Sequence, residues 1–381
     1  MAGIAALTSG CLGFLENERL VVLPHIEQYA SELPDGVYFP ANYAALRNWL
    51  VNLFRSGREE GIVSLAEYAG NRDEDIRSVV GVWRTDPVGE FAVDYITTQP
   101  IGRYQWSFII HYRRGQEEIA DIVQVASTSF LEGLIRQALR RADAGLVIET
   151  QRYNERDFDI AAIIDRILFE EPELCIPPLP PAVSLFPDTG SRRVVDIRFQ
   201  YGDDPHRIRQ NRDSAQLAVQ SILGSLDIEG REPLEQAALL AESLRAWAAL
   251  PTANQSALPS GEEAFLNTAY GALVLRRPTA LGLALAYKQL CATAGLDCRI
   301  VAGQLERRSH VWNLLSGEDY GAHVDLFLAD PIGEEPLVFR LDSEMDAAGY
   351  SWDALRYPPT PDEWPAAETI DYDEETDDNG G

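Results

Sequence analysis

Residues 279–301 read TALGLALAYKQLCATAGLDCRIV, and this stretch decides the fold of the C-terminal part of the chain. Thr279 is a suitable N-cap, because its hydroxyl can accept a hydrogen bond from the first helical turn. The run 280–294 is almost wholly apolar, and a helix without a polar face is buried on nearly all sides. Gly295 can adopt the left-handed conformation that ends a helix. The sequence therefore predicts a buried helix with a defined start and end.

Short strands are predicted after this helix. They are bounded by turn residues and cover 298–301, 310–315, 322–328 and 337–341. Strands joined by short connections pair antiparallel. We therefore expect one buried helix packed on an antiparallel sheet.

Four segments of this region, TAYGALV, GLALAYKQLCATAGLDCRIVAG, SHVWNLL and HVDLFLADP, resemble the transglutaminase-like superfamily of papain-like thiol enzymes. The resemblance covers about residues 265–331 and implies a papain-like domain. Members of that family use a cysteine at the start of the buried helix, a histidine that opens a strand and an aspartate on the next strand. By resemblance, the histidine falls on His310 and the aspartate on Asp325.

The nucleophile position of the family falls on Ala280, in the frame fixed by Gly282 and Ala284. A thiolate at a helix N-terminus is stabilised by the helix dipole and by a protonated histidine, and it is the attacking group. A methyl side chain cannot attack, so acyl transfer through a thioester is excluded for this sequence. Cys291 lies about three turns further along the helix and cannot replace it. The triad, Ala280 with His310 and Asp325, is predicted to be vestigial.

A binding cleft is predicted beside this triad. The resemblance places a paired Trp and Asn on Trp312 and Asn313, and we expect these two residues and His323 to line the cleft. His323 and Asp325 are two positions apart on one predicted strand, and two histidines with a carboxylate would suit zinc. The alternative is that Asp325 orients His310 while His323 packs beside them. We expect no metal and no cofactor.

The N-terminal half repeats one order of elements. A helix, a strand, a helix and two strands are predicted at 43–58, 62–68, 73–84, 91–97 and 104–112, and again at 130–142, 146–153, 158–169, 183–186 and 193–201. We interpret residues 40–210 as two tandem copies of one small α/β unit. Because this order of elements is common, chance similarity is the alternative.

The overall composition restricts the class of protein. The formal net charge is -28, with 32 basic and 60 acidic residues, which argues against nucleic-acid binding because phosphate contacts need clustered Lys and Arg. Hydrophobic residues make up 46% of the chain, as in globular proteins.

The first residues, MAGIAALTSGC, resemble the end of a bacterial lipoprotein signal with Cys11 as lipid acceptor. They predict a membrane-anchored, extracytoplasmic protein. The alternative is a buried N-terminal strand or helix in a cytoplasmic protein.

The predicted fold class is a multi-domain mixture of α/β and α+β. Its parts are a candidate lipoprotein signal (1–15), a first α/β unit (16–125), a second α/β unit (126–210), a helical connector (211–260), the transglutaminase-like domain (261–360) and an acidic disordered tail (361–381).

Three functions are compatible with the sequence. The first is a degenerate transglutaminase-like protein that binds a peptide, protein or cell-envelope ligand without covalent chemistry. The second is an active cysteine peptidase or transamidase in which Ala280 replaces the native cysteine. The third is a structural or interaction protein that acts through its N-terminal α/β units.

Overall fold

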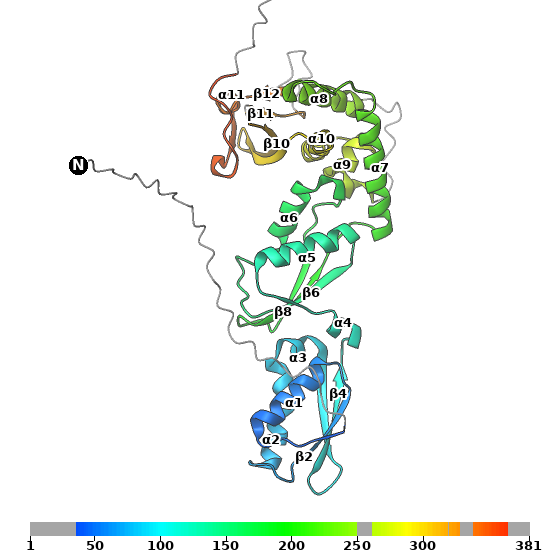
Figure 1. The fold of residues 1–381 in the computed structure, drawn as a ribbon, viewed down its shortest axis with the longest axis vertical. Helices are drawn as coiled ribbons and strands as arrows, with labels where there is room; N and C mark the ends of the chain where they lie inside the picture. The colour runs from blue at the N-terminus through cyan, green and yellow to red at the C-terminus, as the bar shows by residue number, and fades with distance from the viewer. Residues whose placement is uncertain (1–35, 250–260, 319, 328–337, 365–381) are drawn as a thin grey trace, which may run out of the picture. The chain divides into compact units, whose positions relative to one another are not determined.

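The computed structural model describes residues 36–249, 261–318, 320–327 and 338–364 (Figure 1). Cys11, the predicted signal and the acidic tail beyond residue 364 lie outside these ranges. The chain divides into two compact units between Gln116 and Glu117. Within the described residues, no helix is both long enough and apolar enough to cross a membrane.

The first unit is a four-stranded sheet with helices. Its elements are β1 (Val37–Tyr38), α1 (Tyr43–Arg55), β2 (Glu60–Ser64), α2 (Arg72–Val79), a 3₁₀ turn (Val82–Thr85), α3 (Pro87–Ala92), β3 (Val93–Pro100) and β4 (Gln105–Tyr112). The strand order is β1-β2-β4-β3, with β1 parallel to β2 and the other pairs antiparallel. The strand predicted from residue 91 begins later, because Asp86 accepts hydrogen bonds from Val88 N and Gly89 N and starts α3 there.

The second unit opens with a sheet of the same topology. Its elements are α4 (Gln116–Ala120), β5 (Val123–Val125), α5 (Thr128–Arg141), β6 (Gly145–Thr150), α6 (Ile160–Glu170), a 3₁₀ turn (Pro172–Leu174), β7 (Ala182–Phe186) and β8 (Arg193–Arg198). The order is β5-β6-β8-β7, and again only the first pair is parallel. The parallel partners Val37–Ile62 and Val123–Ile148 have the same spacing along the chain. Shared topology is what a duplication would produce, whereas duplication itself stays a prediction. The second sheet includes β5, which lies before the predicted boundary at residue 126.

The rest of the second unit surrounds the buried helix. It comprises α7 (Pro205–Leu223), α8 (Pro233–Ala249), a 3₁₀ turn (Glu262–Asn267), α9 (Ala269–Leu273), α10 (Ala280–Ala294), β9 (Cys298–Leu305), β10 (Arg308–Ser316), β11 (Gly321–Val324), β12 (Val338–Arg340), α11 (Asp342–Ala347), β13 (Tyr350–Trp352) and a 3₁₀ turn (Ala354–Arg356). The sheet order is β12-β11-β10-β9-β13, and every pair is antiparallel. The predicted fold class, α+β and multi-domain with a helix on an antiparallel sheet, is confirmed.

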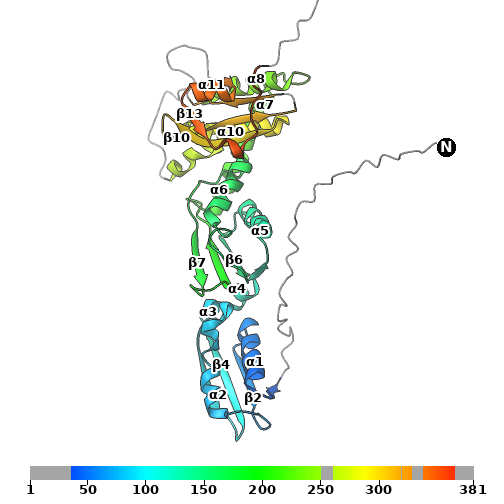
Figure 2. The same ribbon diagram turned by 90° about the vertical axis from the view of Figure 1, so that its left-hand side faces the viewer.

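Helix α10 has the ends that the sequence predicts. The Thr279 hydroxyl accepts a hydrogen bond from Gly282 N at 3.0 Å, and Gly295 has a φ of 84°. The helix packs against β9 and β10 as well as against α7, α8 and α9 (Figure 2). Helices α7 and α8, predicted as a connector, therefore belong to the core that encloses α10. Helix α7 starts at Pro205, before the predicted connector boundary at residue 211, because Asp204 caps it by accepting a hydrogen bond from His206 N.

Candidate functional site

The predicted histidine and aspartate lie together at one end of the third sheet. His310 is near the start of β10, and Asp325 directly follows β11. The antiparallel pairing of β10 with β11, which sets Asn313 opposite Val324, brings these two ends of the strands together. The distance from His310 Nε2 to Asp325 Oδ2 is 2.5 Å, and the Asp325 side chain is only 2% exposed. The structure thus joins two predicted site residues in a buried hydrogen bond.

Asp325 has two further hydrogen-bond donors. The hydroxyl of Tyr350, on β13, donates to Oδ2 at 2.8 Å, and the backbone N–H of Phe327 donates to Oδ1 at 3.0 Å. Burial, and secondarily the charge of Asp325, raises the pKa of Tyr350, so its hydroxyl stays protonated and remains a donor. With His310 included, the carboxylate is satisfied on both oxygens, as a buried carboxylate must be.

The nucleophile position is the first residue of α10. Ala280 is half-buried and carries only a methyl group there. Gly282, two residues further, allows close backbone packing: a Cβ at this position would lie 2.6 Å from Leu266 O. Thr279 strengthens the same contact by donating to Leu266 O at 3.1 Å. The helix start is therefore tightly held, although the methyl group of Ala280 cannot act as a nucleophile.

His323 belongs to a separate buried group. The indole N–H of Trp312 donates to His323 Nδ1 at 2.9 Å, which leaves Nε2–H to donate to Asp342 Oδ1 at 2.9 Å. Burial lowers the pKa of His323, although Asp342 opposes this shift. Since both ring nitrogens are engaged, His323 does not share a site with His310 and Asp325. Among the described residues, no group of three or more His, Cys, Asp and Glu side chains could hold a metal ion.

Asn313 ties the sheet to the buried helix. Its side-chain amide donates to Ala284 O on α10 at 2.9 Å and lies 3.4 Å from Cys298 Sγ. Trp312, Asn313 and His323 are each 1% exposed. The residues expected to line a cleft therefore lie beneath the surface, where they hold the strands and α10 in place.

Three residues of this region were not predicted as part of the site. Tyr350 packs on Trp312 with ring centroids 5.2 Å apart. Asp342 begins α11 and has no local pattern that would link it to His323. Phe327 is 47% exposed, and its ring centroid is 6.4 Å from that of His310. Phe327 stands two positions after Asp325, and only the structure shows that its ring is exposed.

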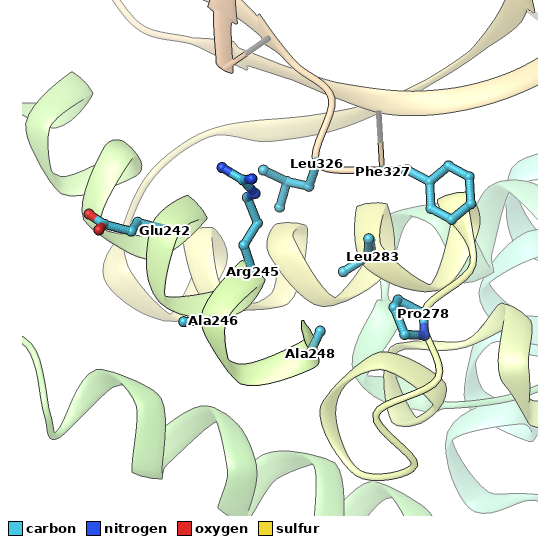
Figure 3. A pocket seen from close by; sticks show the side chains of 8 residues that line it. All are labelled: Glu242, Arg245, Ala246, Ala248, Pro278, Leu283, Leu326 and Phe327. Atoms are coloured by element: carbon cyan, nitrogen blue, oxygen red, sulfur yellow. The ribbon is translucent and has the colours of Figure 1, made fainter. Parts of the chain in front are cut away.

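Phe327 also lines a cavity of about 470 Å³ (Figure 3). The other lining residues come from α8, from the segment before α10, from α10 itself and from the segment after β11, and they are Glu242, Arg245, Ala246, Ala248, Pro278, Leu283 and Leu326. Because Phe327 contacts both, the cavity adjoins the His310–Asp325 pair.

Cys175 and Cys291 do not supply another nucleophile. Cys175, Cys291 and Cys298 are free and buried. Burial raises the pKa of Cys175 to about 12 and raises that of Cys291 well above its ordinary value. A thiol that stays protonated is neither a nucleophile nor a metal ligand.

Comparison with known proteins adds little to what these residues show. No protein-family model matches the chain, and no curated protein sequence matches it. Among solved structures, the chain is similar to one described as "Crystal structure of a TGase", with a TM-score of 0.27 and 11% sequence identity over 68% of this chain and 72% of that chain. A TM-score of this size is below the level at which two chains share a fold.

Proposed function

We propose that this protein is a catalytically degenerate transglutaminase-like protein that binds a peptide, protein or cell-envelope ligand without covalent chemistry. The observation that carries the proposal is the buried His310–Asp325 hydrogen bond beside a helix that begins with Ala280. The orienting pair is present, while the residue that would form the acyl intermediate is replaced by a methyl group.

The cavity next to the pair supports binding. Ligand pockets commonly measure about 300 to 1,000 Å³ and are mostly apolar with a few polar groups, and this cavity fits that description. Phe327 exposes an aromatic ring at its wall, and exposed aromatic residues are frequent ligand contacts. A cysteine at position 280 would instead be expected to give a thiol enzyme.

The test is direct binding of short peptides and peptidoglycan fragments to the full chain, measured by calorimetry. For a ligand that binds, Phe327→Ala should weaken affinity about tenfold, because it removes the aromatic wall. Leu355→Ala is the matched control, since Leu355 is 98% exposed in the same unit and far more exposed than Phe327.

Two results would reject the proposal. In one, no peptide or peptidoglycan fragment binds at millimolar concentration. In the other, ligands bind, but Phe327→Ala and Leu355→Ala leave the affinity equally unchanged.

A further inference from the structure

The cavity beside Phe327 has walls of two kinds. Pro278, Leu283, Leu326 and Phe327 give it an apolar side, and Arg245 and Glu242 are its charged lining residues. A ligand that fills this cavity must therefore bury an apolar group close to a guanidinium.

Arg245 is held at the cavity by α8. Its helical neighbours Leu244 and Ala248 are buried in the core, and Arg245 itself is half-buried. Its side chain extends from α8 toward Leu326, while the exposed Glu242 carboxylate points away from it (Figure 3). Among the residues that the structure describes, no carboxylate is within ion-pair distance of Arg245, in a chain whose net charge is -28.

A guanidinium in this setting can receive an oxyanion such as a carboxylate. Its planar fork of N–H donors matches the two oxygens of a carboxylate, and charge-assisted hydrogen bonds of this kind strengthen where water is partly excluded. We infer that the cavity binds the carboxy-terminal residue of a peptide, with Arg245 receiving the terminal carboxylate and the apolar walls receiving an apolar side chain.

The rest of the peptide has a route past the candidate site. Phe327 lines the cavity and its ring centroid is 6.4 Å from that of His310, so a peptide whose last residue occupies the cavity can extend along Phe327 toward His310. This inference rests on the proposed function and narrows its ligand class to peptides with a free, apolar C-terminus.

The experiment compares two forms of one peptide by calorimetry with the full chain. The first is an acetylated tripeptide that ends in leucine with a free carboxylate, and the second is its C-terminal amide. The free acid should bind tighter by roughly tenfold to a hundredfold, the effect of a hydrogen bond to a charged group. Octanoate is included as an apolar carboxylate that is not a peptide.

Variants at the cation locate the effect. Arg245→Met keeps an unbranched apolar stem, removes the charge and should abolish the preference for the free acid. Arg245→Lys should retain a part of it, because charge remains without the bidentate fork. Arg299→Met is the control: it makes the same charge change at a side chain that is 49% exposed on β9, and it should leave the preference intact.

Each alternative result has a defined meaning. Equal binding of acid and amide, or an unchanged preference in Arg245→Met, overturns the carboxylate inference while the proposed function stands. Binding of octanoate without binding of the peptide overturns the peptide assignment. If neither form of this peptide nor any ligand of the wider survey binds, the proposed function fails together with the inference.

Discussion

Replacing Asp325 by asparagine tests whether the His310–Asp325 pair now stabilises the fold. The Asp325 carboxylate accepts hydrogen bonds from three elements: His310 on β10, Tyr350 on β13 and the backbone of Phe327 after β11. A protein that has lost its nucleophile can retain such a pair for packing alone. The substitution changes hydrogen bonding and charge with almost no change in shape.

The expected cost follows from the bonds that asparagine can replace. With its oxygen toward Phe327 N, the amide directs its NH₂ group at His310 and Tyr350. The Tyr350 hydroxyl then has no acceptor there. A hydrogen bond to a charged group contributes about 1.5 to 3 kcal/mol, and removing one partner of a buried ion pair costs about 3 to 5 kcal/mol. Because asparagine introduces no new charge, we expect a total cost of about 2 to 4 kcal/mol.

The assay is urea unfolding of the full chain, with Tyr350→Phe and Asp346→Asn in parallel. Tyr350→Phe removes one of the three bonds and should cost about 1 to 2 kcal/mol. Asp346 is exposed on α11, so Asp346→Asn makes the same charge change without loss of a buried bond. The chain forms two compact units, and Asp325 belongs to the second. If urea gives two unfolding transitions, the one whose midpoint is unchanged by the substitution serves as an internal reference.

The expectation is refuted if the free energy of unfolding of Asp325→Asn lies within about 0.5 kcal/mol of the values for the parent chain and for Asp346→Asn. Differences of this size are typical of surface substitutions. The pair would then contribute nothing to folding, and its presence would need a functional cause.

Two further predictions concern the start of α10 and the second histidine. In a Cys11→Ser background, the thiol of Ala280→Cys should react with iodoacetamide about tenfold faster at pH ~6 than the thiol of the exposed control Ala302→Cys. The reason is that a helix N-terminus stabilises a thiolate. Equal rates would show that the site does not activate a thiol. Burial lowers the pKa of His323 below its ordinary value of 6.5. The unfolded chain therefore binds a proton at this residue at a higher pH than the folded chain does, and the folded state loses stability as the pH falls below 6.5. When the pH is lowered from about 7.5 to about 5.5, the urea midpoint of unfolding should decrease more for the parent chain than for His323→Gln. An equal decrease of the midpoint in both proteins would contradict this prediction.

Local sequence signals predicted the elements of the candidate site well. The bounds of α10 follow from Thr279, an apolar run and Gly295, each of which acts on neighbouring backbone. The strand that contains His310 was also predicted, and β11 ends earlier than expected. These features depend on hydrogen bonds within one turn or on the alternation of side chains, which a sequence states directly.

Partners distant in the sequence could not be predicted in the same way. Tyr350 reaches Asp325, and Asp342 reaches His323, only because β12, β13 and α11 take their places around one sheet. The same holds for Asn313, whose burial against α10 replaced the expected cleft position. Such contacts depend on strand order and register, which are decided by the packing of the whole core.

The sequence alone therefore determined that this protein has a buried helix beginning at an alanine, and chemistry excludes a nucleophile there whatever the fold. Only the tertiary structure decided that His310 and Asp325 share a buried hydrogen bond with Tyr350, and that a cavity with Arg245 in its wall adjoins them. The physical reason is that the identity of a side chain is local, whereas its partners and its exposure to water are set by long-range packing.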